Sequence, residues 1–203
     1  MSVADRHVST LMRQLASQDV VELIHPFAEW ETIGALAYIA ECYGFRYADV
    51  RHIGKQKMLC VRMVRDAGPR AQQRAAANAA AFPQAGAGGP VPGMYQDSLK
   101  PVPEARPEVD LIATLIRYDA LGAAANRKQL ITMAWAFPLL FVLLAAVTGK
   151  FAVLLTLAAL TPALLLLSLR LNAARRAKLA ARLAAAGCTP VRDERGEEWY
   201  VRP

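Results

Sequence analysis

Charged residues are missing from two long stretches near the C-terminal end of the chain, Leu130–Thr148 and Phe151–Leu169. Neither stretch contains Asp, Glu, Lys, Arg or His, and only Gly149 and Lys150 separate them. At about 1.5 Å per residue, a helix of either length reaches about 28 Å, which matches the hydrocarbon thickness of a bilayer. We therefore expect a hairpin of two transmembrane helices in contact with the lipid bilayer.

Cysteine is scarce. The three cysteines, Cys42, Cys60 and Cys188, are odd in number and far apart, and no Cys-x-x-Cys pair occurs, so no disulfide framework is expected. A metal site built from Cys42, His52 and Cys60 is an alternative, but their spacing matches no common zinc motif. We expect buried thiols that act as small apolar side chains, and neither a metal nor a cofactor.

Residues arranged for catalysis or transport are also missing. His7, His25, His52 and Glu29 form no recognisable nucleophile–base arrangement. The glycines within 86–93 lie among prolines, without the Lys-Ser or Lys-Thr that follows a phosphate-binding loop. The two apolar stretches lack the ionisable residues that an ion or proton pathway normally uses. We expect neither an enzyme nor a transporter that acts alone.

The distribution of basic residues predicts the orientation in the membrane. No signal peptide can be drawn, because Asp5, Arg6 and Arg13 interrupt the N-terminal apolar residues. Basic residues flank the outer ends of the apolar hairpin, namely Arg127, Lys128, Arg170, Arg175, Arg176, Lys178 and Arg182. The turn carries only Lys150, so the positive-inside rule places both termini in the cytoplasm. Arginine outnumbers lysine and alanine is abundant, which suggests a bacterial origin. Together with the two apolar stretches, this predicts a multi-pass protein of a bacterial inner membrane.

Two cytoplasmic segments share one pattern, a helix followed by a β-hairpin. In segment 1–66, the helical spacing of Val8, Leu11, Met12 and Leu15 predicts a helix near 5–17, and a further helix is predicted near 27–43, with Gly44 as its stop. A short apolar piece at 20–24 is counted as a third helix, and strands are predicted over 45–53 and 58–64. In segment 172–203, it predicts a helix that ends at Gly187 and then a second hairpin. The fold class is therefore an α+β membrane protein, whose small cytoplasmic domain is built from two helix–β-hairpin units. They pair within one chain or between chains of a homo-oligomer. In an alternative arrangement, the tail packs separately on a partner.

Three segments connect these units. Segment 67–107 is rich in Pro, Gly and Ala and predicts a linker, with an alanine-rich helix near 70–81. Segment 108–129 predicts a juxtamembrane amphipathic helix, and segment 130–171 is the apolar hairpin. The apolar face of the amphipathic helix favours docking on a protein partner, through Val109, Ile112, Leu115 and Ile116.

Basic residues gather on the first predicted hairpin, at Arg46, Arg51, Lys55, Lys57, Arg62 and Arg65. Three helices followed by a basic hairpin is the order of a winged helix, which favours phosphate contacts from Lys55 and Lys57. The preceding helix instead carries acidic residues, including Glu31 and Glu41, which would repel nucleic acid. Anionic lipid headgroups or an acidic protein partner are therefore the preferred partners of this surface.

The combined pattern predicts a membrane-anchored cytoplasmic adaptor or scaffold, an accessory subunit of a larger membrane-associated assembly. The alternative is a membrane-tethered, winged-helix-like DNA-binding regulator.

Overall fold

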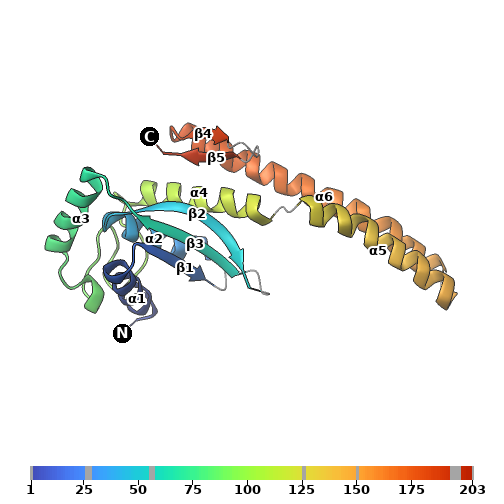
Figure 1. Cartoon of the computed structure of the whole chain (residues 1–203), viewed down its shortest axis with the longest axis horizontal. Helices are drawn as coiled ribbons and strands as arrows, with labels where there is room; N and C mark the ends of the chain where they lie inside the picture. Colours follow the sequence, from blue (N-terminus) through green and yellow to red (C-terminus); the bar gives the residue numbers. More distant parts are fainter. Residues whose placement is uncertain are drawn as a thin grey trace. The chain divides into compact units, whose positions relative to one another are not determined.

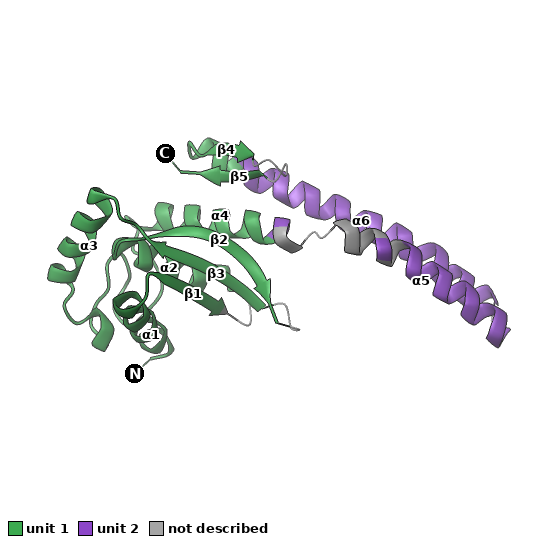
Figure 2. Cartoon of the chain, viewed as in Figure 1, with its two compact units in different colours: residues 1–120, 182–203 green, residues 121–181 purple. Residues whose placement is uncertain are grey.

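The computed structural model describes residues 2–25, 29–54, 58–124, 127–149, 151–192 and 198–202. The chain is a mixed α+β protein that divides into two compact units (Figure 2). Residues 1–120 and 182–203 form unit 1, and residues 121–181 form unit 2.

Unit 1 contains the following elements (Figure 1): α1 (Val3–Ser17), β1 (Val20–His25), α2 (Trp30–Cys42), β2 (Phe45–Ile53), β3 (Met58–Arg65), α3 (Pro69–Ala81), the 3-10 helix η1 (Ala85–Ala87), most of α4 (Arg106–Ala124), β4 (Thr189–Arg192) and β5 (Glu198–Val201). Unit 2 contains α5 (Arg127–Thr148) and most of α6 (Phe151–Ala185).

Helix α1 begins at a capping box. The Ser2 hydroxyl accepts a hydrogen bond from the Asp5 N–H at 3.0 Å, and the Asp5 carboxylate accepts one from the Ser2 N–H at 2.6 Å. These two bonds satisfy donors that the first turn of a helix leaves unpaired. The helical spacing then buries Val8, Leu11 and Leu15, as the sequence pattern predicted for this segment.

Residues 20–24 belong to a strand, so the prediction of a third helix before the hairpin is wrong. Strand β1 pairs antiparallel with β3, with Val20 opposite Val64, and gives a three-stranded sheet of order β1-β3-β2. The segment is short for a helix and rich in β-branched residues, and pairing with β3 satisfies its backbone. The order is therefore α1-β1-α2-β2-β3, and the three consecutive helices assumed in the winged-helix comparison do not occur.

The sheet has two different faces. One cross-strand row on the core side joins Leu23, Val61 and Val50, all of which are buried in the same cluster as α2. On the other face the corresponding row joins Glu22, Arg62 and Asp49. We call this second face the open face; it carries Glu22, Asp49, Arg51 and Arg62. Alternation along each strand separates the apolar and charged sets.

Helix α2 lies at the centre of unit 1 and is buried over most of its length. A Cβ atom on Gly34 would lie 2.8 Å from the Cβ of Ala113 in α4, so glycine permits the close approach of these helices. The helix ends as predicted at Gly44, whose φ of +83° suits a residue without a side chain.

Segment 67–107 is part of unit 1, which corrects its prediction as a separating linker. Its alanine-rich portion forms α3, in agreement with the expected helix. The irregular portion that follows buries Ala85, Val91 and Met94 in the hydrophobic core. Prolines and glycines exclude regular structure here, but the apolar side chains among them still bind the segment to the domain.

The C-terminal segment differs from its prediction in one respect. No helix boundary occurs near residue 172, because α6 is continuous over 35 residues from Phe151 to Ala185. The helix ends before Gly187, which has a φ of +83° as the predicted stop requires. Strands β4 and β5 pair antiparallel with Val191 opposite Trp199, and they form a sheet separate from the three-stranded one.

In unit 2, helices α5 and α6 form a hairpin around Gly149, which has a φ of +69° (Figure 1). Among the described residues of these two helices, the small residues that are buried are Ala145 and Ala158, whereas Ala159 and Ala163 are exposed. Most of the described large apolar side chains of both helices are also exposed.

Among the described residues, α6 is the one helix long and apolar enough to cross a membrane, and none of its apolar window is buried within the chain. The corresponding described portion of α5, Trp135–Thr148, is shorter. Length and composition thus support one candidate membrane span.

Candidate interaction surface and membrane anchor

The C-terminal segment contacts α2 and α4 within unit 1. The Arg202 guanidinium, just after β5, forms an ion pair with the Glu41 carboxylate of α2, which is 7% exposed. The ring of Tyr200 in β5 meets the ring of Tyr118 in α4 edge-on, with centroids 5.1 Å apart. We call these four residues the terminal seam. No motif in the sequence pointed to it, because Glu41 and Arg202 are 161 positions apart.

A second long-range contact joins the sheet to α4. The Tyr47 hydroxyl donates a hydrogen bond to the Asp119 carboxylate at 2.6 Å. Burial raises the pKa of the Tyr47 phenol far above its usual range, and the nearby Asp119 charge raises it further. The phenol therefore remains a donor at every physiological pH and ties β2 to α4.

Three arginines of the predicted basic surface form ion pairs with carboxylates of the same unit. Arg51 pairs with Glu22, and Arg62 pairs with Asp49, both on the open face. Arg65 pairs with Asp19 at 2.7 Å. Among the four described arginines of this prediction, Arg46 alone has no ion pair within the described residues, and its side chain is exposed.

Lys55 and Lys57, the other members of the predicted basic surface, lie outside the described residues. The paired arginines present little net positive charge to a phosphate backbone, and counterion release depends on such charge. This arrangement neutralises three of the six basic residues that motivated the DNA-binding alternative.

The predicted partner-docking helix packs into the core of its own unit. Val109, Ile112, Leu115 and Ile116 are each at most 3% exposed. Three of them, Val109, Ile112 and Ile116, belong to the cluster that also contains α2 and the sheet. The amphipathic pattern was correctly read as a helix, but its apolar face is covered intramolecularly and the predicted docking surface is wrong.

Apolar side chains are instead exposed on the open face, at the edge of the sheet. Val20 is 45% exposed and Ile24 is 49% exposed, both on β1. Within the described residues β1 pairs only with β3, so its other edge has unpaired backbone donors and acceptors. An unpaired edge flanked by exposed apolar residues is a surface that a further strand can join.

The cysteines are buried thiols with separate surroundings. Cys42 lies beside Tyr38, and the Cys60 thiol lies below the Arg51 side chain on the open face. Burial raises the pKa of the Cys42, Cys60 and Cys188 thiols above the usual value. Raised values disfavour the reactive thiolate. No cluster of three metal-ligating side chains occurs among the residues that the structure describes.

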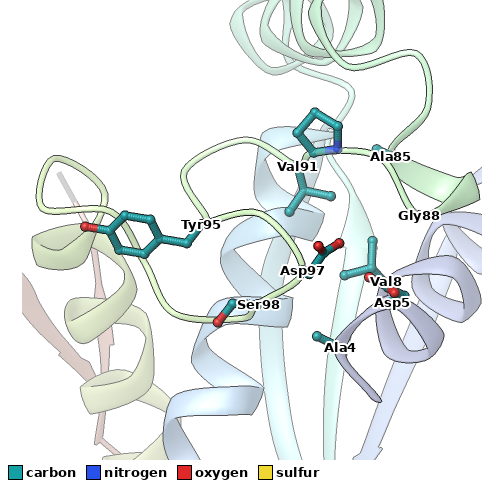
Figure 3. Close-up of a pocket in the computed structure, with 11 residues that line it drawn as sticks. Ala4, Asp5, Val8, Ala85, Gly88, Val91, Tyr95, Asp97 and Ser98 are labelled. Atoms are coloured by element: carbon teal, nitrogen blue, oxygen red, sulfur yellow. The ribbon is translucent and has the colours of Figure 1, made fainter. Parts of the chain in front are cut away.

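A small cavity lies between the start of α1 and the irregular segment after α3 (Figure 3). Val8 and Val91 line it together with Asp5 and Asp97, while the ring of Tyr95 points away from the other lining side chains. Its volume of about 10 Å³ is enough for one water molecule and too small for an organic substrate.

No protein-family model matches the chain, and neither a curated protein nor a solved structure does so.

Proposed function

We propose that this protein is a membrane-anchored cytoplasmic adaptor, an accessory subunit that holds a larger assembly at the inner face of a bacterial membrane. In this proposal α5 and α6 cross the bilayer as a hairpin, and unit 1 is the interaction module in the cytoplasm.

The terminal seam is the observation that carries the proposal. Residues before α5 and residues after α6 belong to the same compact unit, through the Arg202–Glu41 ion pair and the Tyr118–Tyr200 ring contact. A single crossing by α6 would put these residues on opposite sides of the membrane. An even number of crossings keeps them together, which supports α5 as the second span.

The flanking charges support a cytoplasmic unit 1. The first two residues of α5, Arg127 and Lys128, are basic, and several basic residues follow the apolar part of α6, whereas the turn between the helices carries only Lys150. Positively charged flanks are retained on the cytoplasmic side. The far side would then expose only a short turn.

The adaptor role is supported by the β1 edge rather than by α4. The edge combines unpaired backbone groups with the exposed side chains of Val20 and Ile24. A strand supplied by a partner would satisfy the backbone and cover both side chains. We therefore place the contact with the larger assembly on β1.

Cysteine labelling tests the topology. Each native cysteine is replaced by Ala, and Thr148→Cys, Ala79→Cys or Ala186→Cys is added one at a time; all three positions are exposed. An impermeant maleimide added to intact spheroplasts should label the Thr148→Cys variant alone. Labelling of the Ala186→Cys variant from outside would contradict the proposed hairpin.

Site-specific photo-crosslinking tests the adaptor role. A photoreactive residue at Ile24 should give one discrete protein adduct in native membranes, and the same residue at Arg13, exposed on α1, should not. Identical adducts from both positions, or none from Ile24, would contradict binding at the β1 edge.

A further inference from the structure

Several exposed basic residues without an ion pair within the described residues lie on α6. Arg170, Arg175 and Lys178 are exposed, and none of them has an ion pair within the described residues. The sequence of α6 contains no acidic residue over its entire length. On the sheet, by contrast, Arg51, Arg62 and Arg65 are paired with carboxylates, and Arg46 is the one arginine without an ion pair within the described residues. Charge on α6 is therefore available to an external anion.

These three residues lie on one side of the helix. At 100° per residue they fall within an arc of about 140°, and they extend about 12 Å along the axis. We call them the α6 basic face. Arg170 stands between Leu169 and Leu171, both exposed, where the apolar part of the helix ends. The face thus continues directly from the apolar surface of the candidate span.

We propose that the α6 basic face binds the headgroups of anionic phospholipids, and this inference rests on the proposed membrane crossing of α6. Charge complementarity and continuity with the apolar surface favour a lipid over an acidic protein, because the first basic residue lies at the level where headgroups begin. Attraction to an anionic leaflet decreases within a Debye length, about 8–10 Å, so Arg170 and Arg175 would contribute most.

Tryptophan quenching by brominated lipids measures this preference in the full chain. Trp135 is 77% exposed on α5 and becomes the single reporter after Trp30→Phe and Trp199→Phe. The protein is reconstituted with brominated phosphatidylcholine or brominated phosphatidylglycerol, each diluted with unbrominated phosphatidylcholine. We expect phosphatidylglycerol to bind more tightly, by roughly fivefold for each basic residue close to the headgroups.

Two triple variants separate the α6 basic face from overall charge. Arg170→Gln/Arg175→Gln/Lys178→Gln should abolish the preference for phosphatidylglycerol. Arg6→Gln/Arg13→Gln/Arg46→Gln removes three exposed positive charges from unit 1 and should leave it unchanged.

The outcomes distinguish the two proposals. If both triple variants showed the same preference for phosphatidylglycerol, the lipid-binding role of α6 would be overturned. An absence of quenching by either brominated lipid would instead show that Trp135 does not contact lipid, which contradicts the membrane hairpin. Quenching of the wild-type protein by both lipids without a preference for the anionic one would also overturn the inference.

Discussion

Arg202 and Glu41 form an ion pair between the last described residue of the chain and the central helix of unit 1. The Glu41 side chain is 9% exposed and the Arg202 side chain 30%. Glu41 would have no ion-pairing partner in the described structure without Arg202. The C-terminal segment is thus a part of the domain that the N-terminal residues build.

Arg202→Ala should destabilise unit 1, because it leaves the Glu41 carboxylate buried without its cation. Breaking a fully buried pair costs about 3–5 kcal/mol, and the partial exposure of Arg202 reduces our expectation to about 1–3 kcal/mol. Thermal unfolding of the full chain in mild detergent measures the change in Tm. Adding Glu41→Gln should recover part of the loss.

Arg192→Ala is the matched control, since its pair with Glu198 in the same hairpin is exposed. We expect a change within about 0.5 kcal/mol. Equal losses of stability for Arg202→Ala and Arg192→Ala would contradict a special role of the terminal seam.

Tyr47→Phe should lower the stability of unit 1 at neutral pH by about 1.5–3 kcal/mol, because it removes a hydrogen bond to a charged acceptor. The pKa of Tyr47 is raised in the folded state, so its contribution is complete below the unfolded pKa of about 10 and is lost as the pH rises above that value. Stability should therefore fall less steeply above pH 10 in the variant than in the wild type.

The measurement is the Tm of both proteins at neutral and at alkaline pH. Tyr95→Phe provides the control, because Tyr95 is 52% exposed and its loss should leave the Tm unchanged. An alkaline slope that is the same in wild type and Tyr47→Phe would contradict the assigned role of the buried phenol.

Gly34→Ala should destabilise the protein although alanine favours helices. The added Cβ would lie 2.8 Å from the Cβ of Ala113, and overpacking of this kind costs about 1–3 kcal/mol. Ala113→Gly in the same chain should recover part of the Tm, despite the loss of about 1 kcal/mol of helix propensity. If the double variant were less stable than both single variants, the close contact would not be the cause.

Ile112→Ala should destabilise unit 1 by about 2–5 kcal/mol, as expected for a cavity in a packed core. Ile112 is 1% exposed, whereas Asp110 on the same helix is exposed, and Asp110→Ala should have little effect. Limited proteolysis and the Tm report both changes. An unchanged Tm for Ile112→Ala would instead support the interpretation of α4 as a helix whose apolar face docks on a protein partner.

Local patterns predicted most of the secondary structure. The spacing of Val8, Leu11 and Leu15 identified α1, and Gly44 and Gly187 marked the ends of α2 and α6. These predictions depend on interactions between near neighbours, such as helix periodicity and the conformational freedom of glycine. The error at β1 arose because its partner strand lies about 40 positions later in the chain.

Tertiary packing decided which surfaces are available. The amphipathic pattern of α4 is the same whether its apolar face meets a partner or its own domain, and the sequence cannot distinguish the two. The positive charge that Arg51 and Arg62 offer to a partner is likewise reduced by Glu22 and Asp49, which strand pairing brings alongside them. Composition alone identified the two uncharged apolar stretches, because insertion into a bilayer depends on length and hydropathy. Only the tertiary structure revealed the Arg202–Glu41 ion pair. Two residues so distant in sequence come together only when the chain between them has folded.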